Sequence, residues 1–247
     1  MHKFFVDSSN IVDKNVNIIG DDVKHIYKVL RLSVGDIVAI NDCNGNEFVG
    51  KLEEINKKEV KVKIIEKLEE SNEAPVSITL YQGMPKGSKM DLIVQKGTEI
   101  GITKFQPIIT ERVDVAFEEY KKLDRLKRII LEACKQSKRS IIPTINEPIK
   151  FEKVKEELKE YDLVVVPYER ADKYGIKSLC RNISKENIKN IAVVIGPEGG
   201  FEEEEIEELK NIGAEIVTLG KRILRTETAG FVATSLLCYE LGDMGGV

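Results

Sequence analysis

Short runs in which apolar and polar residues alternate fill residues 1–72 and predict a small β-rich domain. Strands are expected at 3–6, 36–41, 46–55 and 59–68, with a turn at 43–46. One helix interrupts them, with an N-cap at Asp21 or Asp22 and an end near Arg31. Its core-facing stripe should contain Val23, Ile26, Tyr27 and Leu30, and its basic stripe Lys24, Lys28 and Arg31.

The pattern changes after a polar segment at 69–75, where we expect a linker between two domains, 1–72 and 73–247. Apolar strands then alternate with helices, which predicts an α/β domain with a parallel sheet covered on both faces. The strands are expected at 76–82, 104–110, 162–168, 191–195 and 215–219. The helices are expected at 88–100, where Ser88 and Asp91 have capping-box spacing, at 117–137, near Lys177, after Phe201, and at 227–241.

The helix expected at 117–137 has two contrasting faces at 100° per residue. The apolar side gathers Leu126, Ile129, Ile130, Ala133 and Ser137. The opposite side carries Lys121, Arg125, Arg128, Glu132, Lys135 and Arg139. Such a row can be a plain solvated face, but together with the basic stripe of the first domain it favours a polyanionic partner, bound through phosphates.

The last expected helix, 227–241, is apolar on nearly every side and should therefore be buried all round. Because a sheet covers only one side of a helix, the remainder must be covered by the same chain or by a second copy. We favour a homodimer formed through this helix.

Composition narrows the class of protein. The 247 residues carry a formal net charge of −4, which by itself argues against nucleic-acid binding, yet acids concentrate at 202–208 and bases predominate between 86 and 140. Four separated cysteines and two histidines lack zinc-site spacing, and no apolar run approaches the length of a membrane span. We therefore expect a cytosolic protein without a metal ion.

A glycine-containing turn at 196–201 follows the buried strand expected at 191–195. Ligands often bind at such strand ends, because glycines allow close approach to the backbone. The spacing matches neither the dinucleotide nor the P-loop fingerprint, and the acidic helix that follows would repel a triphosphate. The turn suits a neutral or cationic ligand such as a sulfonium nucleoside, unless its glycines serve only a tight turn.

A second turn, at 219–226, adds a cation in an unusual place. Thr226 is a good N-cap for the last helix, and Glu227 suits its first turn. Neither role explains Arg225, whose guanidinium meets the positive end of the helix dipole unless an anionic partner or a substrate carbonyl is present. Arg225 is therefore the strongest single candidate for a functional residue.

Taken together, these motifs resemble the RsmE family of SPOUT-class RNA methyltransferases over nearly the full length of the chain. The resemblance rests on residues 25–31 with 35–36, 96–101, 111–112, 132–137, 195–201 and 219–228. It implies an N-terminal PUA-like β-barrel that helps to grip RNA, and a C-terminal SPOUT domain with a deep trefoil knot that works as a dimer. Cys134 and Lys138 depart from the family pattern, which has small residues there.

The resemblance also implies S-adenosylmethionine as methyl donor and N3 of one uridine in 16S ribosomal RNA of the 30S subunit as target. The cofactor pocket would be lined by Val166, Pro167, Gly196, Glu198, Gly200, Leu219, Gly220, Ile223, Leu224 and Thr226. RNA would be held by His25, Lys28, Arg31, Arg112, Arg128 and Arg139.

For catalysis, we expect Arg225 to donate to a uracil carbonyl oxygen while Glu132 or solvent receives the proton. Glu132 is equally suited to pair with Arg128 or Arg139. Two other functions remain open: methylation of a ribose hydroxyl or another base, and RNA binding without catalysis.

Overall fold

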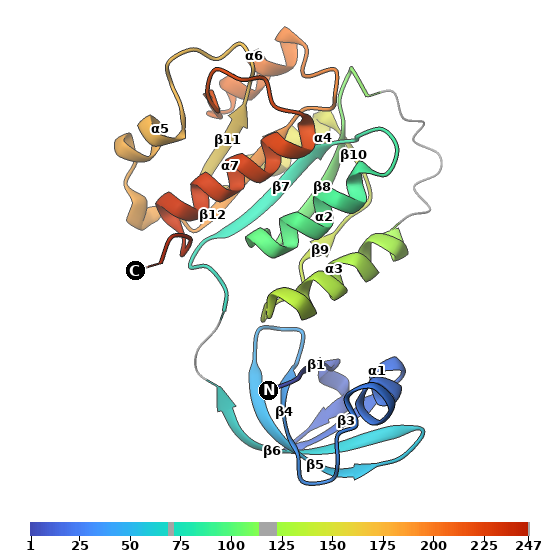
Figure 1. Cartoon of the computed structure of the whole chain (residues 1–247). Helices are drawn as coiled ribbons and strands as arrows, with labels where there is room; N and C mark the ends of the chain where they lie inside the picture. The colour runs from blue at the N-terminus through green and yellow to red at the C-terminus, as the bar shows by residue number, and fades with distance from the viewer. Residues whose placement is uncertain (69–71, 114–122, 247) are drawn as a thin grey trace. The chain divides into compact units, whose positions relative to one another are not determined.

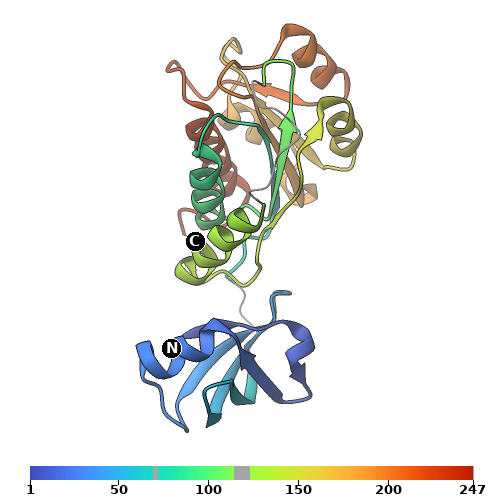
Figure 2. The same ribbon diagram turned by 90° about the vertical axis from the view of Figure 1, so that its right-hand side faces the viewer.

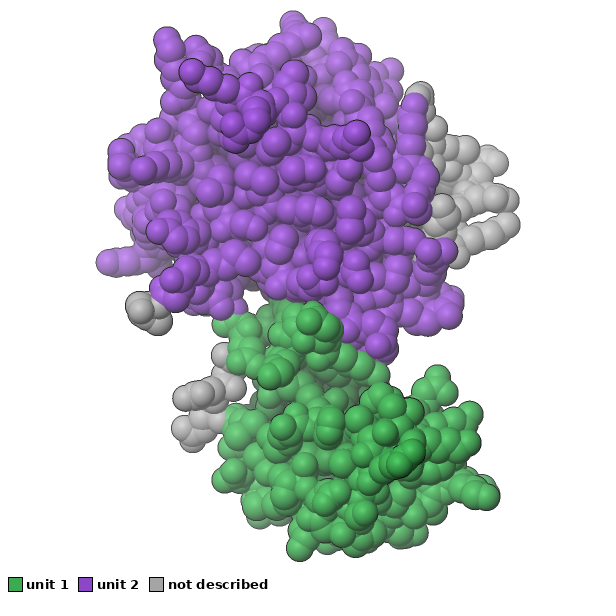
Figure 3. Space-filling model, viewed as in Figure 1, with its two compact units in different colours: residues 1–73, 134–142 green, residues 74–133, 143–247 purple. Residues whose placement is uncertain are grey.

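The computed structural model describes residues 1–68, 72–113 and 123–246. They form two compact units, one of residues 1–73 with 134–142 and one of residues 74–133 with 143–247 (Figure 3). The units differ from the expected domains in segment 134–142, which belongs to the first unit. The expected linker at 69–75 lies partly outside the described residues. Each helix among the described residues is too short or too polar to span a membrane.

The first unit is built on a six-stranded sheet in the order β1–β4–β5–β6–β3–β2 (Figure 1). Neighbouring strands are antiparallel, except that β1 and β4 are parallel. All expected strands are confirmed to within one residue, whereas the β2–β3 hairpin was not predicted. The strands are β1 (Lys3–Phe5), β2 (Ile11–Val12), β3 (Asn15–Ile19), β4 (Ile37–Asn41), β5 (Glu47–Ile55) and β6 (Glu59–Leu68).

The expected helix of this unit is α1 (Asp21–Lys24), which continues as the π-helical η2 (His25–Leu30). Its N-cap is Gly20, with φ of 77°, so the expected cap at Asp21 or Asp22 is wrong. Both acids lie in the first turn, where they suit the helix dipole. The apolar stripe is confirmed, since Val23 and Ile26 are buried and the remaining members pack against the same core.

The second unit contains a sheet in the order β10–β8–β7–β12–β11–β13, with β9 beside β8 (Figure 1). Every strand pair is parallel, which confirms the predicted parallel sheet. The strands are β7 (Ser77–Gly83), β8 (Lys104–Ile109), β9 (Thr144–Ile145), β10 (Ile149–Lys150), β11 (Leu163–Pro167), β12 (Asn190–Ile195) and β13 (Glu215–Val217). The trefoil knot stays a prediction.

Helices cover both faces of this sheet (Figures 1 and 2). On one face α4 and α6 bury a core that includes Tyr81, Val166, Val194 and Ile206. On the other, α7 packs against β7, β12, α2 and α5. The helix α4 was not predicted. The helices are α2 (Lys89–Ile100), α3 (Leu123–Ser137), α4 (Phe151–Leu158), α5 (Ile176–Asn182), α6 (Glu203–Asn211) and α7 (Thr226–Leu241), with short 3-10 turns η1 (Ser8–Asn10) and η4 (Lys185–Asn187).

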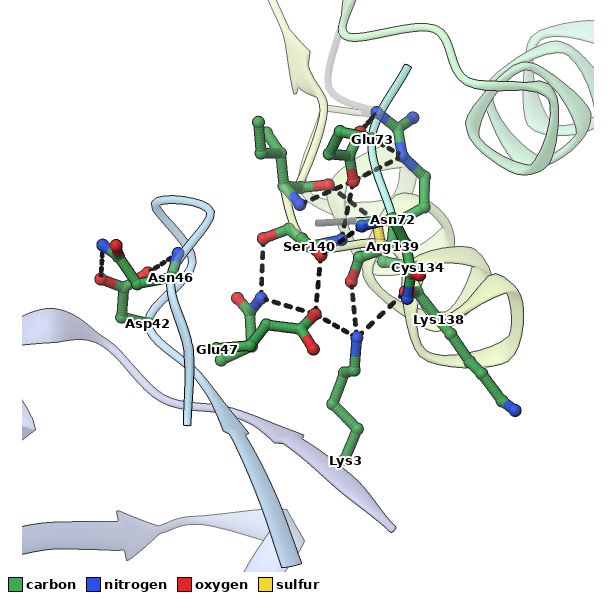
Figure 4. Close-up of polar contacts among 12 residues, drawn as sticks. Lys3, Asp42, Asn46, Glu47, Asn72, Glu73, Cys134, Lys138, Arg139 and Ser140 are labelled. Atoms are coloured by element: carbon green, nitrogen blue, oxygen red, sulfur yellow. Dashed lines mark hydrogen bonds and ion pairs between the residues drawn. The ribbon is translucent and has the colours of Figure 1, made fainter. Parts of the chain in front are cut away.

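A buried polar network anchors segment 134–142 within the first unit (Figure 4). Glu73 pairs with Arg139 and accepts from the backbone amide of Ser140 at 2.7 Å. The Ser140 hydroxyl donates to Glu47 at 2.7 Å, and Asn41 Nδ2 donates to the Ser140 carbonyl at the same distance. Arg139 is only 4% exposed and lies beyond the end of α3, so the expectation that it joins an exposed basic row and binds RNA is wrong.

Candidate active site

A cavity of about 580 Å³ lies at the carboxyl ends of β11, β12 and β13 in the second unit. The strand order reverses nearby, between β7 and β12, and such reversals are where open α/β sheets place their ligands. Of the expected cofactor residues, Val166 does not reach the cavity, because its side chain is fully buried in the core shared with α4 and α6. The others line it: Pro167, Gly196, Glu198, Gly200, Leu219, Gly220, Ile223, Leu224 and Thr226.

Glycine is required at two positions here: at Gly83, where β7 meets the turn at 196–201, and at Gly200 within the turn. A Cβ atom on Gly83, at the end of β7, would lie 2.4 Å from the backbone nitrogen of Pro197, so β7 and the turn are in direct contact. Gly200 has φ of 72°, a conformation that side chains disfavour. The turn is therefore held tightly against the sheet, with its backbone facing the cavity.

Arg112 holds this turn through hydrogen bonds to Gly199 and Glu202. Its Nε and Nη2 donate to the two carboxylate oxygens of Glu202, both at 2.6 Å, and its Nη1 donates to the Gly199 carbonyl at 2.9 Å. The hydrogen bond from Arg112 holds the pKa of the Glu202 carboxyl below its ordinary value. The guanidinium that we expected to contact RNA thus makes its hydrogen bonds to the turn at 196–201 and the residue that follows it.

Thr226 joins the two turns. Its hydroxyl donates to the Gly196 carbonyl at 2.6 Å and accepts from Gln82 Nε2 at 2.8 Å. The N-cap of α7 is Arg225, so the expected N-cap role of Thr226 is wrong. The hydroxyl instead links the start of α7 to the ends of β7 and β12.

Arg225 lies exposed at the wall of the cavity, immediately before α7. Within the part of the chain that the structure describes, its guanidinium has no hydrogen bond or ion pair. A cation with open donors beside a ligand cavity can bind a carbonyl oxygen or an anion. This placement supports the role that the sequence suggested.

Lys221, Arg222 and Lys89 also line this cavity, and Lys89 was not identified as a site residue from the sequence. Lys89 is held by carboxylates. Its Nζ donates to Glu198 at 2.8 Å and lies 3.7 Å from a carboxylate oxygen of Glu227. Glu198 also accepts from the backbone amide of Lys86 at 3.0 Å. Partial burial opposes ionisation of Glu198, but these hydrogen bonds outweigh it and lower the pKa of its carboxyl. The Ser88–Asp91 spacing had suggested only a helix start.

That helix start is confirmed with Ser88 as N-cap, although its side chain makes no capping hydrogen bond.

Glu132 lies elsewhere. It lines a separate hollow of about 370 Å³ with Gln95, Arg125, Arg128 and Ile129, and it does not line the cavity that contains Arg225. Among the described residues, the two expected catalytic residues therefore do not share a cavity. Arg125 pairs with Asp91, and Lys135 pairs with Asp22. Lys121 lies outside the described residues.

The basic residues of the first unit are available to a partner. His25, Lys28 and Arg31 are all exposed around η2. Lys28 Nζ lies 5.8 Å from the centre of the Tyr27 ring, and Arg31 ends the helix with φ of 54°. In the second unit, Arg128 on α3 is also exposed.

Comparison with known proteins identifies the class. The RNA methyltransferase domain family matches residues 72–238, and the RNA methyltransferase PUA domain family matches residues 18–65. The chain is therefore an RNA methyltransferase with an N-terminal PUA-like domain, and the predicted fold class is confirmed apart from the knot.

Relatives at the level of whole chains define the family. The ribosomal RNA small subunit methyltransferase E of Bacillus subtilis is 34% identical, over 91% of this chain and 90% of its own. That of Aquifex aeolicus is 36% identical, over 87% and 90%. The crystal structure of the Neisseria gonorrhoeae protein, bound to S-adenosyl methionine, superimposes with a TM-score of 0.83 at 31% identity, covering 99% of each chain. The chain belongs to the ribosomal RNA small subunit methyltransferase E (RsmE) family, as the motifs indicated.

Proposed function

We propose that this protein transfers the methyl group of S-adenosylmethionine to N3 of a uridine in 16S ribosomal RNA. We further propose that it acts in the cytoplasm, as a homodimer, on assembled or nearly assembled 30S subunits. The observation that carries the proposal is the exposed guanidinium of Arg225 on the wall of a cavity formed by two glycine turns. Family membership and the small-subunit substrate in the names of the relatives support it.

The cavity fits the cofactor. Its volume of about 580 Å³ lies within the range of roughly 300–1,000 Å³ that small-molecule sites occupy. Ile195, Leu219 and Leu224 provide apolar walls, and the backbone of the two turns can bind the edges of an adenine ring. Glu169 and Glu198 suit a ligand that carries an ammonium and a sulfonium group.

S-adenosylmethionine supplies the methyl group: the N3–methyl bond forms, the methyl–sulfur bond breaks with its electrons left on sulfur, and the N3 proton passes to solvent or a carboxylate. Negative charge develops on the uracil carbonyl oxygens as this proton leaves. Arg225 is placed to donate to one of them and so to stabilise that charge. The glycine turns, fixed by Thr226 and Arg112, hold the cofactor in position.

Small subunits from a strain that lacks the gene, incubated with the protein and S-adenosylmethionine, test this proposal. Mass spectrometry of the digested RNA should show N3-methyluridine. Arg225→Ala should reduce kcat by about 100-fold, the usual effect of removing one donor to a developing oxyanion. Calorimetry should give the same cofactor affinity for both proteins. Methylation of a ribose or another base, or unchanged turnover in Arg225→Ala, contradicts the proposed chemistry.

The dimer is supported by the surface of α7. Leu236 is 40% exposed and Tyr239 64% exposed, and Leu92 on the neighbouring α2 is 42% exposed. These side chains give a mainly apolar helix a surface that a second copy can cover. Sedimentation equilibrium should give a dimer for the wild type and a monomer for Leu236→Glu. A monomeric wild-type protein contradicts this part of the proposal.

RNA contact is proposed through the exposed cations His25, Lys28, Arg31 and Arg128, mainly to phosphates. Affinity for small-subunit RNA should fall steeply as salt increases, because each phosphate contact releases counterions. A flat salt response contradicts this. We no longer include Arg112 and Arg139 among the proposed RNA contacts, because Arg112 binds the Gly199 carbonyl and Arg139 pairs with Glu73.

A further inference from the structure

We propose that Lys89 is a second substrate-binding cation, which pairs with Arg225 so that each contacts one of the two carbonyl oxygens flanking N3 of uracil. The site would thereby select uracil over cytosine. This inference rests on the proposed function and adds a residue and a basis for specificity to it.

Lys89 and Arg225 line the same cavity, and each lies at the N-terminus of a helix. Lys89 is the first residue of α2, and Arg225 is the N-cap of α7. The two helices pack side by side (Figure 1), and both side chains line the cavity. The hydrogen bond to Glu198 raises the pKa of Lys89, and the positive charge of Arg225 opposes that rise.

Two carboxylates lie close to the Lys89 ammonium group, but they do not occupy all of its hydrogen-bond donors. One of its three donors is engaged by Glu198 at 2.8 Å. Glu227 is at 3.7 Å, too far for a hydrogen bond, and its buried Oε2 has no hydrogen-bond partner among the described residues. The Lys89 side chain remains 33% exposed. A purely structural ion pair would satisfy Glu227, whereas this arrangement leaves ammonium donors for a ligand.

The chemistry of uracil matches two cations. Its N3 lies between two carbonyl groups, and loss of the N3 proton spreads negative charge over both oxygens. One donor on each oxygen stabilises that charge better than a single donor. Cytosine carries an amino group in place of one carbonyl, and a cation facing that amino donor is repelled and unpaired. Glu198 and Glu227 act as positioning residues that aim Lys89.

The test compares Lys89→Met and Lys89→Arg with Lys96→Met. Lys96 is a matched control, because it lies on the same helix and pairs with Glu99, yet does not line the cavity. Small subunits from a strain lacking the gene serve as substrate. The readouts are kcat, KM, cofactor affinity by calorimetry, the pH–rate profile and the melting temperature.

We expect Lys89→Met to lose about 100-fold in kcat, with cofactor affinity within about twofold of wild type. The pH at which the rate of Lys89→Met reaches its plateau should be higher than in the wild type, because the deprotonated uracil is less stabilised. Lys89→Arg should recover part of the rate. Lys96→Met should behave as wild type in every assay. If Lys89→Met does not fold, the pH–rate profile of Lys89→Arg tests the inference instead. The inference then requires that this profile be shifted from that of the wild type.

Wild-type kcat and pH profile in Lys89→Met, or a loss confined to cofactor affinity, overturn the inference while leaving the proposed function intact. Absence of N3-methyluridine with the wild-type protein overturns the proposed function and the inference together.

Discussion

The hydroxyl of Thr226 donates to the backbone carbonyl of Gly196 at 2.6 Å, joining the first residue of α7 to the turn that follows β12. The same hydroxyl accepts from Gln82 at the end of β7. Three segments far apart in the chain therefore meet at one buried oxygen. The position of Arg225, one residue earlier, depends on this contact.

Thr226→Val, which keeps the shape of the side chain, should lower both stability and cofactor affinity. It removes the Thr226 donor from the Gly196 carbonyl and leaves Gln82 Nε2 with only the Gly83 carbonyl as acceptor, and an unsatisfied buried group costs about 1–3 kcal/mol. Thermal unfolding and calorimetry with S-adenosylmethionine measure the two effects. Thr228→Val, at a partly exposed position two residues later, is the control. Equal behaviour of the two variants would show that the contact is dispensable.

Arg112→Gln should weaken cofactor binding several-fold and leave RNA affinity unchanged. The guanidinium holds Gly199 and Glu202, and bidentate pairing is lost on substitution by an amide. Arg128→Gln should show the reverse pattern, with weaker RNA binding and unchanged cofactor affinity. Calorimetry and RNA filter binding separate the two. Loss of RNA affinity in Arg112→Gln alone would restore the role first expected from the sequence.

Cys134 should make the protein less stable at alkaline pH. Burial raises the pKa of its thiol to about 12, from an ordinary value of 9.0. The folded state then keeps the proton that the unfolded state releases above pH 9, so stability falls as the pH rises through that range. The loss of melting temperature between pH 8 and pH 10.5 should be smaller in Cys134→Ala than in wild type. Equal losses in the two proteins would refute the assignment.

Lys138→Gly should stabilise the protein. Lys138 follows the end of α3 with φ of 58°, which costs a side chain about 1 kcal/mol and costs glycine nothing. The contacts at this position use its backbone carbonyl, which the substitution keeps. Chemical denaturation should show a gain of up to about 1 kcal/mol. Lys127→Gly, within α3, should instead lose about 1 kcal/mol, and a loss in both variants would contradict the conformational argument.

Periodicity predicted most elements of the fold because strands and helices each bury one face. It located β5 and β6 almost to the residue and identified the apolar face of α3. It missed α4, which begins at Phe151 without a side-chain cap, and the two-residue strands, which are too short for an alternating pattern. It also gave no sign of the π-helical turn at His25–Leu30.

The candidate site was predicted where it depends on local chemistry and missed where it depends on tertiary contacts. Glycines after strands and a cation at a helix start identified the cavity and Arg225. The angular position of Arg139 was extrapolated past the last residue of α3, where the chain turns inward to Glu73. Nothing local to Lys89 or Arg112 reveals that carboxylates more than 80 residues away hold them.

The buried network around Glu73 also determines how the chain can be divided. Segment 134–142 belongs to the first unit but is inserted in the sequence of the second. A fragment that begins at residue 74 would carry Arg139 away from the carboxylate that neutralises it, and the fragment 1–73 would lose the Ser140 contacts of Asn41 and Glu47. Neither unit can therefore be obtained intact by a single proteolytic or genetic cut. Any domain swap between relatives must exchange two separate stretches of chain together.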